Sequence, residues 1–144
     1  MFRLGKKREE AFMENDLEKI AADAEGLYRS GRMNCAEAVL AAVMRRFMPE
    51  AGEETVRMAA GFGGGSGAGC ICGAVAGGTM AFGLILGNNK AWAKSLTREL
   101  HRWFKDEYGA SCCKVILQTR GKICYELTGK VAGKVAEMLE MQGA

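Results

Sequence analysis

The sequence lacks the cysteine and histidine spacings of several well-known sites. It contains no C-x-x-C, which excludes the thioredoxin-type motif and the paired ligands of a zinc finger, and no C-x-x-C-H for covalent haem. His101 is the only histidine. It is next to Arg102 in an amphipathic pattern typical of a surface or boundary residue, so catalysis by a Cys–His pair has little support.

Strong charge is also missing. The net charge is +3 and the sequence pI is near 8.6. A nucleic-acid-binding surface needs lysines and arginines clustered on one face, so no nucleic-acid partner is expected. The first ten residues include basic side chains but no apolar core of a secretory signal behind them. We therefore expect a cytoplasmic protein, in which cysteines stay reduced.

The chain has no apolar run that is long enough to span a membrane. No charged residue falls between Arg57 and Lys90, yet the helical part predicted there, from about Cys72 to Leu86, is shorter than the roughly 20 residues that a span requires. The glycine-rich segment before it contains no G-x-G-x-x-G, and G-x-x-x-x-G-K-[ST] is absent from the whole chain. We expect neither a membrane span nor a nucleotide site, and interpret the uncharged stretch as a buried central helix.

Helix-forming residues dominate what is present. Proline occurs once, aromatic residues make up 8%, and the apolar residues are mostly Ala, Leu, Val and Met. Apolar side chains recur at three- and four-residue spacings, and no segment alternates like a strand. These patterns predict one all-α domain over residues 1–144, a bundle of six to seven helices around a central apolar helix rich in glycine and alanine, with residues 1–10 as a loosely ordered basic segment. The helices are expected at about 8–30, 34–48, 53–60, 72–86, 90–108, 111–117 and 125–141.

Two capping signals fix helix starts. Asn34 with Glu37 three residues later resembles a capping box, and Ser111 is expected to cap the short sixth helix. Gly61 to Gly87 carries 11 of the 20 glycines and supplies two of the six cysteines. The cysteines lie close to predicted helix starts, where unpaired N–H groups favour thiolate over thiol or suit an anionic metal cluster.

Several of these residues together resemble a known family. The segments Asn34-Cys35-Ala36-Glu37-Ala38-Val39, Gly61-Phe62-Gly63-Gly64-Gly65 and Cys72-Gly73-Ala74-Val75-Ala76-Gly77, followed by Cys113 and Cys124, are similar to the C_GCAxxG_C_C family of redox-active proteins. The resemblance runs from about Tyr28 to Met138 and implies a small, mostly helical, soluble protein with four characteristic cysteines: Cys35, Cys72, Cys113 and Cys124. A related domain occurs in split-Soret cytochromes, but without the haem motif we expect no haem here.

The resemblance implies redox activity and leaves its chemistry open. The first hypothesis is an iron–sulfur or other thiolate-bound metal centre for electron transfer, because four thiolates are the usual ligands of a cluster. The second is a metal-free thiol–disulfide protein, with Cys72 attacking. The third is a non-catalytic helical binding protein whose cysteines only pack. Neither the substrate nor the redox partner can be inferred, and the residues do not decide whether the protein is an enzyme.

The remaining predictions concern residues near the four cysteines. Cys70 and Cys112 are extra to the family pattern and are candidate substitute ligands or resolving thiols, and which of Cys112 and Cys113 occupies the family position is open. Gly63, Gly64, Gly65 and Gly73 are expected beside a bound group, because glycine allows close backbone approach. A homodimer through the glycine-bearing helices is a further alternative to a monomer.

Overall fold

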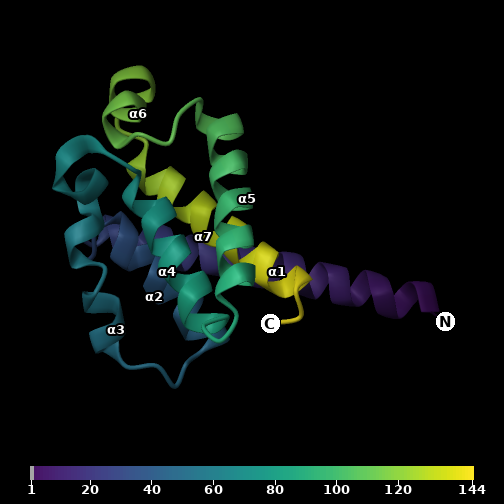
Figure 1. Cartoon of the computed structure of the whole chain (residues 1–144). Coiled ribbons are helices and arrows are strands. Elements are labelled where there is room, and N and C mark those ends of the chain that lie inside the picture. The colour runs from purple at the N-terminus through teal and green to yellow at the C-terminus, as the bar shows by residue number, and fades with distance from the viewer. Residues whose placement is uncertain (1) are drawn as a thin grey trace.

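The computed structural model describes the backbone of residues 2–144 and the side-chain surroundings of residues 15–144. The described chain is one all-α domain without a strand, as predicted (Figure 1). Its elements are, in order, α1 (Phe2–Arg29), α2 (Cys35–Phe47), α3 (Glu53–Arg57), the 3₁₀ turn η1 (Ala60–Phe62), the turn η2 (Gly65–Gly69), α4 (Gly73–Ile85), α5 (Lys90–Tyr108), α6 (Cys113–Arg120) and α7 (Cys124–Met141).

The apolar helix α4 lies at the centre of the bundle, which confirms its predicted role. It packs against α2, α5 and α7, and Figure 1 shows it between them. Its small residues make this possible. A Cβ at Gly77 would collide with the Ala36 carbonyl oxygen of α2, and one at Gly78 would lie 2.8 Å from Val135 Cγ2 of α7. The absence of charge from this helix therefore reflects burial, as expected.

The helices around α4 are amphipathic. On α5, Leu96, Leu100 and Phe104 are buried, while α7 packs against α1 and α2 and buries Val131 and Val135. The first turns of α1 extend past the bundle (Figure 1). The predicted loose order of residues 1–10 stays a prediction, since their side chains lie outside the described part.

The capping box at the start of α2 is confirmed. The side-chain oxygen of Asn34 accepts a hydrogen bond from the Glu37 N–H at 2.9 Å, and the Asn34 N–H donates to the Glu37 carboxylate at 3.0 Å. The Asn34 amide also donates to the Ala60 carbonyl oxygen at 2.9 Å. One side chain thus fixes the start of α2 and ties it to the segment that leads into the glycine turn.

Replacing Asn34 with alanine is expected to lower the free energy of unfolding by about 1–2 kcal/mol, because it removes the cap and the hydrogen bond to Ala60. Asn89→Ala is a matched comparison, since Asn89 caps α5 through a single hydrogen bond to the Trp92 N–H, and its expected loss is smaller. Urea denaturation of the two variants measures the difference. Equal losses would contradict the added role of Asn34.

Three sequence predictions need correction. The first helix begins at Phe2, before the predicted start near Arg8. The third ends at Arg57, where hydrogen bonds between residues three apart replace the α-helical ones, and the chain continues into η1. Ser111 does not cap α6. The N-cap residue is Cys112, without a side-chain capping bond.

The helices of the described residues can be compared with the requirements for a membrane span. No helix among them combines the length and the apolar character that crossing a bilayer demands.

Candidate functional site

The glycine turn before α4 has an unusual backbone. Four consecutive residues, Gly64, Gly65, Ser66 and Gly67, adopt left-handed φ values of 66°, 66°, 62° and 70°, a conformation that residues with a Cβ resist. A Cβ at Gly65 would also lie 2.6 Å from the Cys70 backbone nitrogen. The turn therefore needs its glycines in order to fold back, and by folding back it aims the segment from Cys70 to Cys72 at the start of α6.

A short backbone bridge joins this segment to the loop before α6. Ile71 and Cys112 form an isolated antiparallel pair. The Cys72 N–H donates to the Ser111 carbonyl oxygen at 2.8 Å, and the Cys113 N–H donates to the Cys70 carbonyl oxygen at 2.5 Å. The bridge explains why Ser111 is not a cap, because the loop around it pairs with the glycine-rich segment instead.

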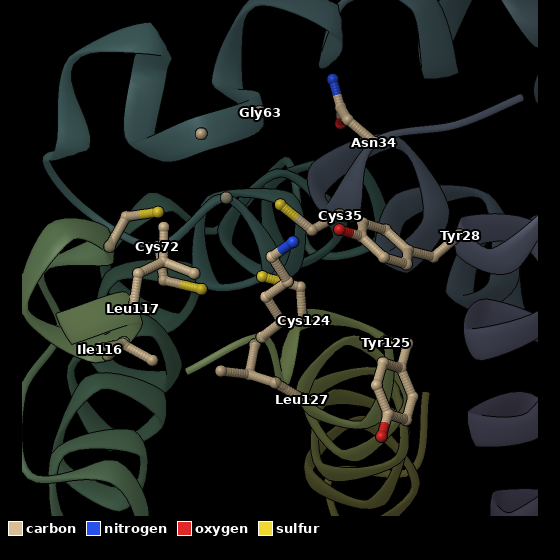
Figure 2. Close-up of a pocket in the computed structure, with 14 residues that line it drawn as sticks. Tyr28, Asn34, Cys35, Gly63, Cys72, Ile116, Leu117, Cys124, Tyr125 and Leu127 are labelled. Carbon is tan, nitrogen blue, oxygen red and sulfur yellow. The ribbon is translucent and has the colours of Figure 1, made fainter. Parts of the chain in front are cut away.

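All four cysteines of the family pattern line one cavity of about 690 Å³ (Figure 2). Cys35, Cys113 and Cys124 are the first residues of α2, α6 and α7, and Cys72 is the residue before α4. The helix-start positions predicted for the thiols are thus confirmed. The full lining is Tyr28, Asn34, Cys35, Gly63, Gly64, Cys72, Gly73, Cys113, Ile116, Leu117, Lys122, Cys124, Tyr125 and Leu127.

The two extra cysteines do not line the cavity. Cys70 is exposed, and the Cys112 thiol donates instead to the Gly69 carbonyl oxygen at 3.1 Å. Of the adjacent pair, Cys113 is therefore the one whose side chain reaches the other thiols. All six cysteines are free.

Three of the four glycines expected beside a bound group, Gly63, Gly64 and Gly73, line the cavity, and Gly65 does not. Gly65 is instead buried as the first residue of the turn η2, where an added Cβ would lie 2.8 Å from Cys113 Cβ. A Cβ at Gly73 would collide with Cys35 Sγ and would lie 2.7 Å from the Phe62 carbonyl oxygen. Glycine at 73 therefore gives the Cys35 thiol its place beside α4.

Burial favours the protonated form of three of the four cavity thiols, those of Cys35, Cys72 and Cys113. It raises the pKa of Cys72 to about 12, with the nearby Cys35 adding to the effect, and it also raises the pKa values of Cys35 and Cys113. Hydrogen bonds from backbone N–H groups act in the opposite direction, from Ala74 and Val75 to Cys72. The helix-start effect expected from the sequence is thus present, but burial outweighs it.

Tyr28 is a site residue that sequence reasoning missed. It lies in the last turns of α1, close enough to the Cys124 thiol for that group to affect the pKa of its hydroxyl. Figure 2 shows the ring extending toward Cys35. Burial, followed by the nearby Cys124 thiol, raises the pKa of Tyr28 to about 12. No local pattern marks this residue, because its role depends on α1 packing against α7.

Lys122 and the wall residues were missed for the same reason. Lys122 belongs to the loop before α7, and Ile116, Leu117, Tyr125 and Leu127 come from α6 and α7. The only available signal was proximity in sequence, since Lys122 and Tyr125 flank Cys124.

The side chains of the described residues do not form a ready-made site for a single metal ion. Within the described part of the chain, no group of three or more His, Cys, Asp or Glu side chains could hold a metal ion. A single tetrahedral ion requires sulfurs at about 2.3 Å from it. Four thiols are the usual donor set of an iron–sulfur cluster.

Comparison with known proteins gives one result. A family model described as "Putative redox-active protein (C_GCAxxG_C_C)" matches residues 33–138, most of the chain and all four cavity thiols. No curated protein and no solved structure matches significantly.

Proposed function

Because the chain belongs to the C_GCAxxG_C_C family of redox-active proteins, we propose that its cavity holds a thiolate-bound metal centre, with an iron–sulfur cluster as the first candidate, and that the protein transfers electrons. Cys35, Cys72, Cys113 and Cys124 are the proposed ligands. One observation carries the proposal: four thiols from four separate helix starts line the same cavity.

Burial of the sulfurs would not by itself prevent them from binding a metal. Three of the thiols have raised pKa values because they are buried, and a metal ion overcomes such a shift by deprotonating the thiol that it binds. A bound iron–sulfur cluster would supply one-electron chemistry at the cavity. The backbone would help to carry the negative charge, since the N–H groups of Gly64 and Ala36 hydrogen-bond Cys35, and those of Ala74 and Val75 hydrogen-bond Cys72.

The deciding experiment is the metal and sulfide content of protein expressed and purified without oxygen. The proposal expects coloured protein with iron and acid-labile sulfide. Colourless, metal-free protein would remove the cluster hypothesis and leave thiol–disulfide chemistry as the form of redox activity.

Tyr28→Phe is expected to make the reduction potential of the loaded centre more negative, by tens of millivolts. The Tyr28 hydroxyl lies near Cys124 and would donate a hydrogen bond to the ligand sulfur in the loaded centre, where such a bond stabilises the reduced, more negative state. Tyr125→Phe is the control. Tyr125 follows Cys124 directly in the sequence and also lines the cavity, but no interaction of its hydroxyl with a thiol is expected. Equal potentials in Tyr28→Phe and wild type, measured by anaerobic titration, would argue against this role.

The metal-free thiol–disulfide alternative requires a reactive thiolate, and the burial of Cys72 speaks against that residue as the attacking group. With its pKa raised to about 12, Cys72 stays protonated at pH 8 and ionises only in strongly alkaline solution. We expect metal-free protein to alkylate at Cys72 at least about tenfold more slowly than free cysteine at pH 8. Mass spectrometry of iodoacetamide-treated protein measures the rate. Alkylation as fast as that of free cysteine would favour the thiol–disulfide alternative.

The third alternative, cysteines that only pack, has less support. Cys72 is part of the buried core, but Cys35, Cys113 and Cys124 are only half-buried and face open space. If these residues only packed, serine at all four positions would alter stability and leave metal content unchanged.

A further inference from the structure

The cavity has more volume than a single metal ion bound to its four thiols would fill. Structural metal sites are closed around the ion, whereas the volume here, about 690 Å³, lies within the roughly 300–1,000 Å³ range of small-molecule sites. Three of the four thiols that border it, those of Cys35, Cys113 and Cys124, are only half-buried. The cavity therefore offers room for a molecule beside the thiols.

The part of the wall without sulfur is largely apolar. Ile116, Leu117 and Leu127 contribute aliphatic surface, and Tyr28 and Tyr125 contribute rings. Leu117 is 44% exposed and Tyr125 is 38% exposed, although both border the cavity. The apolar body of a ligand would cover these side chains and remove their contact with water, as in most small-molecule sites.

The charge on the cavity wall indicates the charge of the ligand that it would favour. Lys122 is the only formally charged side chain among the fourteen lining residues, and no carboxylate accompanies it. None of the ion pairs found among the described residues includes Lys122. Of the other polar side chains, Asn34 is already hydrogen-bonded to Glu37 and Ala60, and Tyr28 and Tyr125 contribute hydroxyl groups.

From these observations we propose that the cavity binds a small organic anion, such as an aromatic or branched carboxylate, with its apolar body between α6 and α7 and its charged group at Lys122. This inference rests on the proposed function in one respect, since the anion would share the cavity with the proposed thiolate-bound centre. The anion site itself involves residues other than the thiols.

The test uses benzoate as the probe, with acetate, benzyl alcohol and benzylamine as comparisons. Isotopically labelled protein is titrated with each compound, and backbone amide shifts report both affinity and location. Benzoate is expected to bind at least about threefold more tightly than each of the other three, because it alone has both an apolar ring and a negative charge. Its shifts should centre on Leu117, Lys122 and Tyr125, which line the cavity from α6 to the start of α7.

Two lysine variants separate the site from general surface charge. Lys122→Gln is expected to weaken benzoate binding at least about threefold and to leave benzyl alcohol binding unchanged. Lys114→Gln is the matched control, because Lys114 is an exposed lysine on α6 outside the cavity lining, and it should bind benzoate like wild type. Equal binding of all four compounds, equal effects of the two variants, or shifts away from the cavity would overturn the proposal.

The titration is repeated on anaerobically purified protein and on the same protein after treatment with a metal chelator. Benzoate binding in a preparation that never contained iron would uphold the anion site and reject the metal centre. Iron-containing protein without benzoate binding would do the reverse.

Discussion

Cys72→Ser is expected to reduce the iron and sulfide content of anaerobically purified protein at least about tenfold. The reason is its position: Cys72 is the most buried of the four cavity thiols and receives two backbone hydrogen bonds at the start of α4. Even residues that only support a metal ligand change affinity by about 10- to 100-fold when replaced, and a ligand itself should have at least that effect. Iron and sulfide assays on purified protein measure the change.

Cys70→Ser is the matched control. Cys70 lies two residues away on the same bridged segment, but its side chain is exposed and outside the cavity, so wild-type iron content is expected. Circular dichroism of both variants, and of Cys72→Ala, separates loss of the centre from loss of the fold. If folded Cys72→Ser kept its iron, or if Cys70→Ser lost as much, Cys72 would not be a ligand.

Gly77→Ala is expected to lower the free energy of unfolding by about 1–3 kcal/mol, or roughly 3–12 °C in Tm. The added Cβ would collide with the carbonyl oxygen of Ala36 and would lie 3.0 Å from its Cα. These are backbone atoms of a packed helix, so α2 and α4 would have to separate. Because Cys35 and Cys72 are at the starts of these helices, the change is also expected to lower metal content. Thermal melts of the metal-free protein isolate the effect on stability.

Gly83→Ala serves as the control on the same helix. Gly83 is exposed, and a Cβ there would meet no atom within 4 Å. Alanine is favoured over glycine inside a helix, so a gain of about 0.5–1 kcal/mol is expected. If both substitutions changed stability in the same direction and by the same amount, close packing of α2 on α4 would not explain Gly77.

Local signals made most of the fold predictable from the sequence. Asn34 and Glu37 are three residues apart, so their capping box depends on nothing outside one helical turn. The helix Lys90–Tyr108 lies between the capping Asn89 and the left-handed Gly109, and both ends were predicted. The predicted capping role of Ser111 was wrong because a segment distant in sequence pairs with the loop that contains it. The Ser111 carbonyl oxygen accepts a hydrogen bond from the Cys72 N–H.

Only those residues of the candidate site that are marked by their spacing in the sequence could be predicted. The family spacing identified Cys35, Cys72 and Cys124, and all three line the cavity. The exclusion of Cys70 follows from the left-handed turn, whose backbone angles no pairwise spacing reveals. Lys122 and Tyr28 also escaped prediction, since their approach to the thiols depends on how α1, α6 and α7 pack.

The helix α6, which forms one wall of the cavity, has fewer packing contacts with the bundle than the helices that form the other walls. This helix packs mainly on the turn η2 rather than on the bundle, buries only Ile116, and is flanked by Gly109 and Gly121 with φ values of 81° and 72°. Segments with few buried apolar contacts open locally at a lower free energy than the global unfolding of a protein. We therefore expect α6 to exchange its amide hydrogens as a separate unit. Cys113 would then be released before the other three thiols, so exchange of a bound group with solvent would begin at α6 and leave the bundle intact.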